Sequence, residues 1–409
     1  MANAHLERRS EGPNLCLGMA DYAPVLDFID KKWDALTRSA RVDEGTRIGL
    51  PGRYVVPSDG AMFQEMYYWD SFFTSLGLVG TSREGLVVEM ADNMAYLLDR
   101  FGVIPNASRY YFLSRSQPPF FTRQMMLAWS VKNARGDRDS MTWLAHMVAL
   151  AEAEHDTVWL GNAQPHDRLI HRGLSRYFDI NHLDFLASCE SGWDHSNRCD
   201  DRWLEHAPVD LNSILAVCEA DIARAHMILG NVDSAARWSA TRDRRVRTVR
   251  SLMWDSDCGC FLDYDVANKR LNSTVSLAAF YPLWAGIATK PQARRLMIEW
   301  YPKFLKRGGL VTSLKAKNGR QWAYPNGWAP LQWIAVEAMR AYGFHTEATE
   351  VMRRWCDTTA EVFASTGEMW EKLNVVTGSE RSEAGMYGAI TGFGWSNAVF
   401  VDFARRVAP

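Results

Sequence analysis

Two carboxylates far apart in the chain each follow a tryptophan in a loop-like stretch: Asp194 follows Trp193, and Glu371 follows Trp370. Cleavage of a glycosidic bond needs a proton donor for the leaving oxygen and a second carboxylate that attacks or activates water. Flanking aromatic rings would desolvate a carboxyl group and raise its pKa, as a general acid requires. Asp194 and Glu371 are therefore the candidate catalytic residues.

An ordinary structural role is the alternative for each candidate carboxylate. Asp194 and Glu371 could cap helices, or they could pair with Arg198 or Lys372. Asp70 precedes an apolar stretch and is either a helix N-cap or a carboxylate that holds two sugar hydroxyls at a helix start. The residues alone leave these alternatives open.

Aromatic rings, amides and arginines alternate in the same short segments as the carboxylates. Sugars bind with one ring face on an aromatic plane, while carboxylates, amides and arginine hold the hydroxyls. Arg115 precedes a Pro-Pro turn, where it either binds hydroxyls or forms a surface ion pair. Trp328 follows an Asn-Gly turn, where it is either a sugar platform or a packing residue of the core.

Composition and charge exclude several classes of partner. The net charge is −2, and no basic run suggests a nucleic-acid groove, so a small neutral substrate is expected. The ten histidines show no metal-ligand spacing, and no Gly-rich phosphate loop is present, so we expect neither metal nor cofactor. No stretch of 18 apolar residues predicts a membrane span.

The cysteines and the N-terminus predict a cytoplasmic protein. Seven cysteines at irregular spacing suggest free thiols in a reducing compartment, and Cys258-Gly-Cys260 is too tight for a standard zinc site. The first residues lack the apolar core of a secretory signal. The sequence leaves open whether the protein is a monomer or a homo-oligomer.

The elements that must position these residues are mostly helical. Apolar spacing predicts helices over 23–38, 70–80, 84–101, 121–134, 139–154, 211–229, 233–254, 275–287, 291–306, 329–342, 346–365 and 396–406. Short hairpin pieces are expected at 260–265 and 309–313. No linker divides the chain, so we predict a flexible segment over 1–20 and one all-α catalytic domain over 21–409. A helical barrel would gather the unusual loops at one end.

Six segments in this order resemble the trehalase family of glycoside hydrolases: 57–73, 104–121, 191–198, 321–332, 371–374 and 385–397. The resemblance spans about residues 50–400. It implies an (α/α)6 barrel with long active-site loops and an inverting, cofactor-free mechanism, in which Asp194 is the general acid and Glu371 the base. It also implies a sugar site lined by Phe63, Tyr67, Trp69, Asp70, Asn106, Arg115, Gln117, Trp193, Trp322, Asn326 and Trp328.

The chain departs from the family pattern at several charged sugar-binding positions. Met62 stands where the family has Arg, and Ala323 where it has Asp. Met386 stands where the family has Glu, although a shifted loop would let Glu383 replace that residue. An unpaired buried polar partner costs about 1–3 kcal/mol. We therefore expect the glucose subsite beside the catalytic pair to be kept and the leaving-group subsite to be altered.

The favoured hypothesis is an inverting hydrolase of a small α-glucoside, either trehalose or a trehalose-like disaccharide. One alternative is an α-glucosidase for a glucosylated polyol or compatible solute, of the glucosylglycerol or glucosylglycerate type. Another is a non-catalytic sugar-binding protein, although such a protein has no need of both Asp194 and Glu371.

Overall fold

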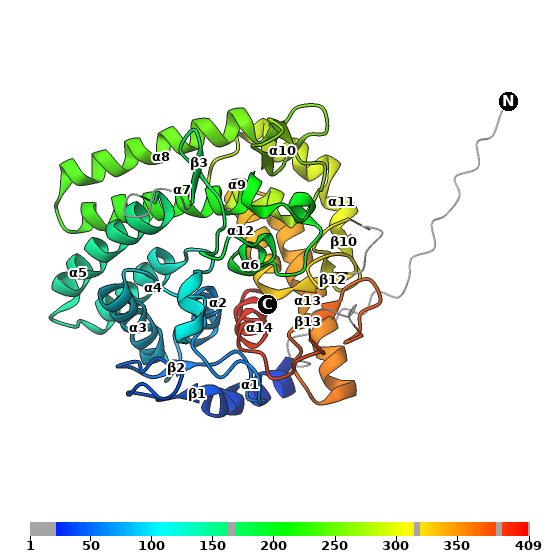
Figure 1. Ribbon diagram of the computed structural model, residues 1–409. Coiled ribbons are helices and arrows are strands. Elements are labelled where there is room, and N and C mark those ends of the chain that lie inside the picture. Colours follow the sequence, from blue (N-terminus) through cyan, green and yellow to red (C-terminus); the bar gives the residue numbers. More distant parts are fainter. Residues whose placement is uncertain (1–21, 162–167, 315–319, 382–386, 408–409) are drawn as a thin grey trace.

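A computed structural model describes residues 22–161, 168–314, 320–381 and 387–407. Its helices form an (α/α)6 barrel, in which an inner ring of helices is enclosed by an outer ring (Figure 1). The inner ring runs through α2 (Tyr68–Leu78), α4 (Phe121–Arg135), α7 (Val209–Ile228), α9 (Tyr281–Trp284), α12 (Ala329–Ala341) and α14 (Gly394–Val407). The outer ring consists of α1 (Ala23–Leu36), α3 (Gly85–Phe101), α5 (Ser140–Ala153), α8 (Val232–Leu252), α10 (Lys290–Glu299) and α13 (His345–Thr366). The ring closes where α14 packs against α2.

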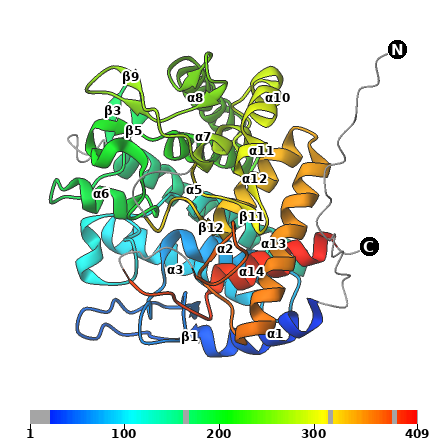
Figure 2. The same cartoon turned by 90° about the vertical axis from the view of Figure 1, so that its right-hand side faces the viewer.

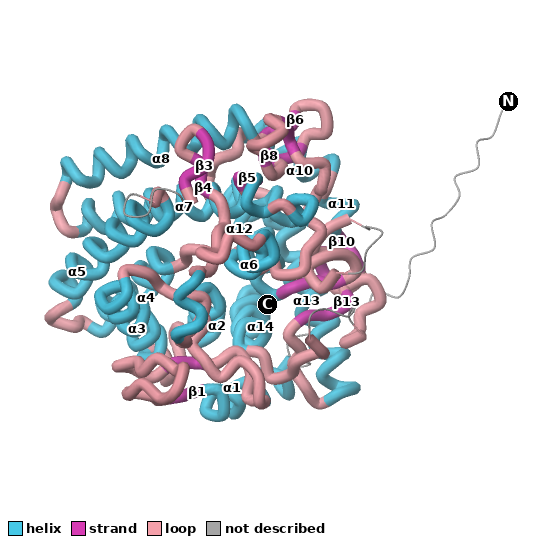
Figure 3. Tube along the Cα trace, in the orientation of Figure 1, coloured by secondary structure: helices cyan, strands magenta, loops and turns pink. Residues whose placement is uncertain are grey.

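The two ends of the barrel differ in their connections. Each inner helix reaches the next outer helix through a short turn, whereas each outer helix leads to the next inner helix through a long connection. These long connections carry the short helices α6 (Asp184–Glu190), α11 (Tyr301–Phe304), η2 (Tyr110–Ser114), η3 (Glu154–Trp159), η4 (Arg198–Asp201), η5 (Trp203–Glu205) and η6 (Leu277–Phe280). The N-termini of the inner helices therefore share one end of the barrel with the long loops (Figures 2 and 3).

The strands are two or three residues long and lie in the same long connections (Figure 3). Antiparallel pairs join β1 (Thr37–Arg38) to β2 (Tyr54–Val55), β3 (Leu169–His171) to β4 (Leu174–Ser175), β6 (Trp254–Asp255) to β7 (Cys260–Phe261), β10 (Leu305–Lys306) to β11 (Gly309–Leu310), and β12 (Asn326–Trp328) to β13 (Lys372–Asn374). A further sheet has the order β5 (His206–Ala207), β8 (Tyr264–Asp265) and β9 (Arg270–Leu271). These strands fix the loops above the barrel.

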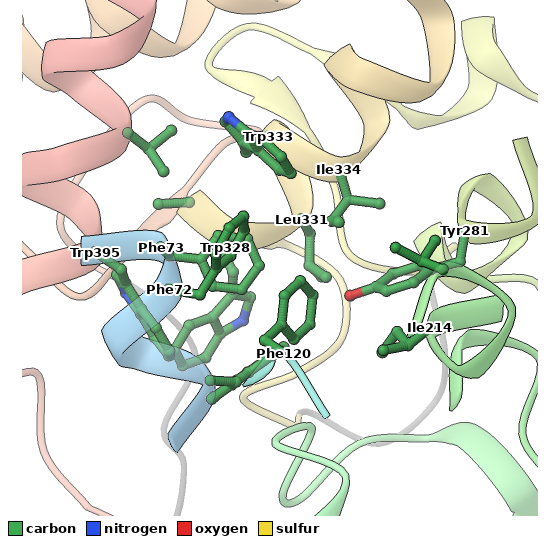
Figure 4. Close-up of a cluster of buried hydrophobic side chains, with 14 of the residues drawn as sticks. Phe72, Phe73, Phe120, Ile214, Tyr281, Trp328, Leu331, Trp333, Ile334 and Trp395 are labelled. Carbon is green, nitrogen blue, oxygen red and sulfur yellow. The ribbon is translucent and has the colours of Figure 1, made fainter. Parts of the chain in front are cut away.

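Buried aromatic side chains of α2, α12 and α14 fill the barrel below the loops (Figure 4). Phe72 stacks on Phe120 with ring centroids 5.0 Å apart and packs edge-on against Trp333. Close packing of α2 on α14 depends on Gly77, because a Cβ there would lie 2.6 Å from the Cα of Ala398. This core holds the first turns of the inner helices rigidly beneath the loops.

The predicted all-α class and helix positions are confirmed. In α3 the periodic residues Leu86, Val87, Met90 and Met94 are buried, and Gly102 ends the helix with φ +69°. Two details are wrong. α2 begins at Tyr68, so Asp70 lies in the first turn instead of at the N-cap. The predicted helix 291–306 is divided at Trp300 into α10 and α11, and its last two residues form β10. The predicted hairpin pieces are strands, but β7 pairs with β6 and not with β8. The predicted segment 1–20 lies outside the described residues, and the division at residue 21 stays a prediction.

Candidate active site

Asp194 lies in the loop between α6 and η4, and a glycine sets its position. Gly192 has φ +70°, and a Cβ there would lie 2.6 Å from Cζ2 of Trp69, so the loop rests directly on that ring. The side chain of Asp194 accepts a hydrogen bond of 2.8 Å from Nε2 of Gln321 at Oδ2. Burial, and then the negative charge of Glu371, raises the pKa of Asp194 to about 7. Asp194 is thus set up to hold a proton near neutral pH.

Glu371 lies immediately before β13, and both its carboxylate oxygens have partners. Nζ of Lys372 lies 2.6 Å from Oε2, and the hydroxyl of Tyr387 donates a hydrogen bond of 2.7 Å to Oε1. The backbone carbonyl of Glu371 accepts hydrogen bonds from Trp395 Nε1 and Ser396 Oγ at the start of α14. Burial raises the pKa of Glu371, and the positive charge of Lys372 opposes that rise.

One segment, 321–328, connects the two carboxylates. Ser196, two residues after Asp194, pairs with Trp322 in a parallel bridge. At the other end of the segment, Trp328 pairs with Lys372 in the β12–β13 ladder. The loops of Asp194 and Glu371 are therefore held on either side of the same short stretch of chain.

Asp70 is a third carboxylate in the site. It is buried in the first turn of α2, and Gln117 hydrogen-bonds to its side chain. Burial raises the pKa of Asp70, and the negative charges of Glu371 and Asp194 raise it further. The three carboxyl groups are thus close enough for their charges to interact, so each proton held by one affects the others.

The predicted tryptophans form one stacked and interlocked group. Trp322 and Trp328 are parallel at 4° with centroids 3.8 Å apart, while Trp69 and Trp193 lie 5.9 and 5.7 Å from Trp322. All four are buried. Trp328 also donates a hydrogen bond from Nε1 to the carbonyl of Gln321. The group supports both carboxylate loops, and its contact with a sugar stays a prediction.

Phe63 and Tyr67 are less deeply buried than the tryptophans. The ring of Phe63 meets Tyr67 and Tyr387 edge-on at 5.7 and 5.3 Å. Phe63 has φ +60°, an uncommon backbone conformation for a bulky residue. Such strain persists only when neighbours fix it, and it often marks functional sites.

The remaining predicted polar residues hold the loop from 104 to 121 in place. Asn106 donates hydrogen bonds to the carbonyls of Ser116 and Cys189. Gln117 accepts a hydrogen bond from the backbone N–H of Trp69. These amides stabilise the loop itself, and their contact with substrate stays a prediction.

Two other predicted site residues are also engaged within the protein. Arg115 forms an ion pair of 3.3 Å with Asp179, but this pair is largely buried and is not the surface ion pair considered as the alternative. The positive charge of Arg115 also acts to lower the pKa of Asp194. Asn326 is buried and donates a hydrogen bond to the carbonyl of Gln321. Glu383 and Met386 lie outside the described residues.

The structure decides between the ordinary pairings considered for the two carboxylates. Arg198 does not pair with Asp194: it is buried, stacks on Trp193 and forms ion pairs of 2.7 and 2.8 Å with Asp210 and Asp263. Glu371, in contrast, does pair with Lys372. Because this ion pair lies inside the candidate site, the pairing of Glu371 with Lys372 does not argue against a catalytic role for Glu371.

The sequence did not predict that Gln321 and Tyr387 are hydrogen-bond partners of the carboxylates. It treated Lys372 only as an alternative to a catalytic role of Glu371, whereas the structure shows Lys372 as part of the site. All three lie within the segments that carry the resemblance, at 321–332, 371–374 and 385–397. Their place in these segments was the signal that could have identified them. Contacts between distant segments, however, cannot be inferred from spacing in the sequence alone. The arrangement brings together two buried carboxyl groups with different partners, an amide at Asp194 and an ammonium at Glu371. Acid–base cleavage of a glycosidic bond requires a pair of carboxyl groups.

Among the described residues, no group of three or more His, Cys, Asp or Glu side chains is placed to hold a metal ion. The cysteines in the described part of the chain are all free thiols; Cys16 lies outside it. A helix long and apolar enough to cross a bilayer does not occur in the described ranges.

The family model for trehalase matches residues 17–181 and 182–408. The chain belongs to the trehalase family. It is 34% identical to a periplasmic trehalase from Xanthomonas campestris over 91% of this chain and 72% of the relative. It is also 34% identical to one from Pseudomonas aeruginosa over 95% and 77%. As a member of this family, the protein is a glycoside hydrolase.

Solved structures agree on the architecture. The neutral trehalase from Saccharomyces cerevisiae matches with a TM-score of 0.75 and 27% identity over 94% of this chain and 80% of the other. A mannosylglycerate hydrolase from Thermus thermophilus matches with a TM-score of 0.69 over 93% and 99%. At 19% identity, that likeness shows the fold alone.

The expectation of a cytoplasmic protein is wrong. The curated relatives from Xanthomonas and Pseudomonas are named periplasmic trehalases, which contradicts it. The expectation rested on free thiols and on the composition of the first residues. Both observations are indirect, whereas the names of the relatives state a compartment.

Proposed function

We propose that this trehalase-family enzyme hydrolyses a small α-glucoside, trehalose or a trehalose-like disaccharide, with inversion at the anomeric carbon and release of β-glucose. The observation that carries the proposal is the contrast between two neighbouring carboxyl groups. The pKa of Asp194 is raised to about 7, with an amide as its hydrogen-bond partner, whereas Glu371 is in contact with the ammonium of Lys372. Two carboxyl groups whose environments separate their protonation states are typical of an acid and a base.

In the proposed mechanism Asp194 protonates the glycosidic oxygen while Glu371 takes a proton from a water molecule on the opposite face of the sugar ring. The C–O bond breaks as the new C–O bond to water forms, in a single displacement. Inversion requires a carboxyl separation of about 6.5–9.5 Å to admit that water, and a separation near 5 Å indicates retention. Phe63, Tyr67 and Asp70 would bind the glucose ring beside the pair.

Trehalose is the first candidate substrate, because the curated relatives bear that activity in their names. A glucoside with a smaller or less hydroxylated leaving group is the second. It is favoured by Met62, which is exposed, and by the buried Ala323, because both stand where the family has charged residues. Neither side chain can replace the lost hydrogen bonds to a second glucose unit.

The test is to incubate the purified enzyme in parallel with trehalose, glucosylglycerol, glucosylglycerate, kojibiose and sucrose, and to follow released glucose. D194N serves as the matched blank. Turnover of trehalose alone supports the first candidate, and turnover of a polyol or acid glucoside with little trehalose cleavage supports the second. Calorimetric binding of these sugars without turnover by the wild-type enzyme would instead indicate a sugar-binding protein and overturn the proposal.

A further inference from the structure

Lys372 places a buried positive charge in the site. Its side chain is 2% exposed, that of Glu371 is 1% exposed, and Nζ lies 2.6 Å from Oε2 of the carboxylate. The ammonium also lies over the rings of Trp328 and Tyr387, 5.0 and 5.2 Å from their centroids. Burying an ammonium is costly unless it is paired, and here one carboxylate and two ring faces surround it.

The ion pair adds little to the architecture, because it joins consecutive residues. The backbone of Lys372 is already held by pairing with Trp328 in the β12–β13 ladder. The carbonyl of Glu371 is already held by Trp395 and Ser396. The main effect of the ammonium is therefore on the charge and orientation of the Glu371 carboxylate.

The charge matters because three carboxyl groups share the site. The titratable groups that face Glu371 are Lys372, Tyr387, Asp70 and Asp194. In the described part of the chain, neither Asp70 nor Asp194 has an ion pair, whereas Glu371 has one. Burial raises the pKa of all three carboxyl groups, and contact with Lys372 opposes that rise most directly at Glu371.

We propose that Lys372 is a positioning residue of the reaction, whose buried ammonium keeps Glu371, among the three carboxyl groups, ionised and aimed for its role as base. The side chain of Lys372 is buried beneath the rings of Trp328 and Tyr387, so we place its action on Glu371 and not on the substrate. Oε2 is fixed by the ammonium and Oε1 by the Tyr387 hydroxyl, so one carboxylate orientation is selected. The inference rests on the proposed function, since the ionisation of Glu371 matters to turnover only if Glu371 is the base.

The test is the pH profile of kcat/KM for K372Q, which keeps a hydrogen-bond donor but removes the charge. An opposite charge in contact lowers a carboxyl pKa by about 1–3 units. The acid limb of the profile should therefore move to higher pH by about 1–3 units. At pH values below the new limb, kcat/KM of K372Q should fall about tenfold for each unit of this shift. K372R, the matched control, keeps the charge and should leave that limb near its wild-type position.

A merely structural role predicts something different. It would lower kcat/KM of K372Q by the same factor at every pH, and this outcome would overturn the inference while leaving the proposed function intact. Failure of the wild-type enzyme to hydrolyse any glucoside would overturn the proposed function instead. The two failures are therefore distinguishable in one data set.

A second comparison covers the case in which K372Q folds poorly. If Lys372 serves the charge of Glu371, the double variant E371Q/K372Q should melt at a higher temperature than K372Q at pH 7, because no unpaired buried carboxylate remains. K372Q alone should also gain melting temperature as the pH falls and Glu371 takes up a proton. Equal melting temperatures of the single and double variants at pH 7 would contradict the inference.

Discussion

The side-chain amide of Gln321 donates a hydrogen bond of 2.8 Å to Oδ2 of Asp194, although the two residues are 127 positions apart. The same amide lies 3.3 Å from the backbone carbonyl of Asp194. This donor engages Oδ2 and so fixes the orientation of the Asp194 carboxyl group. In the proposed mechanism, Oδ1 would be the oxygen that carries the proton toward the substrate.

Replacing Gln321 with leucine should impair the chemical step. A hydrogen bond to a charged group contributes about 1.5–3 kcal/mol, so its loss should lower kcat about 10- to 150-fold if the bond is made fully in the transition state. KM should change little, because the amide faces the acid. Steady-state kinetics check this, and an unchanged kcat would show that Asp194 does not depend on the amide.

D194N and E371Q should each lower turnover of a natural glucoside by about 100- to 10,000-fold, because each removes acid or base assistance. The two variants should differ with α-glucosyl fluoride, whose leaving group needs no protonation. D194N should hydrolyse this substrate far better than E371Q does. Equal activity of the two variants on the fluoride would contradict the assignment of acid and base.

The pH dependence of the free energy of unfolding should reflect the raised pKa of Asp194. Its pKa is about 7 in the folded protein against an ordinary 3.8, so the folded state keeps a proton that the unfolded chain releases between these values. The free energy of unfolding therefore falls as pH rises through that window, by roughly 1.4 kcal/mol per pH unit at most. The D194N variant should not lose stability in this way, because asparagine does not titrate.

Thermal melts at pH 4, 6 and 8 measure this effect. The melting temperature of D194N relative to wild type should be nearly unchanged at pH 4 and should increase toward pH 8. D243N, at an aspartate whose side chain is 63% exposed, is the control and should show no such trend. A constant difference between D194N and wild type at all three pH values would mean that folding does not raise the pKa of Asp194.

Gly192 should be essential where Gly136 is not. Both have a left-handed backbone, with φ +70° and +72°, and an alanine costs about 1–2 kcal/mol in this conformation. At Gly192 the new Cβ would also lie 2.6 Å from Trp69, whereas at Gly136 it would meet nothing within 4 Å. G192A should lose at least tenfold in kcat/KM, while G136A should lose stability only. Full activity of G192A would show that the Asp194 loop tolerates displacement.

The helical barrel could be predicted because its signals are local. Apolar spacing such as Leu86, Val87, Met90 and Met94 marks a buried helix face wherever it occurs, and glycines such as Gly102 mark helix ends. The order of the six motif segments indicated the trehalase family. Predicted and observed helix boundaries differ by a few residues. Asp70 lies in the first turn of α2 and not at its N-cap, because the extended Tyr67 is the N-cap residue and the helix begins at Tyr68.

The partners of the candidate site could not be predicted, because they are set by three-dimensional packing. Arg198 is near Asp194 in sequence but points to Asp210 and Asp263, which belong to other elements. Tyr387 reaches Glu371 across 16 residues, and its ring covers Lys372. Spacing in the chain says little about such contacts once the connecting segment is a long loop.

The central claim is single displacement by Asp194 and Glu371, and the stereochemistry of the first product tests it most directly. Proton NMR recorded in real time during trehalose hydrolysis, or hydrolysis of the glucoside that proves best, resolves the anomeric signals before mutarotation. With single displacement, β-glucose appears first from the cleaved α-glucosyl unit, and α-glucose from that unit grows only at the mutarotation rate. Initial release of α-glucose from that unit would demonstrate retention and rule out single displacement.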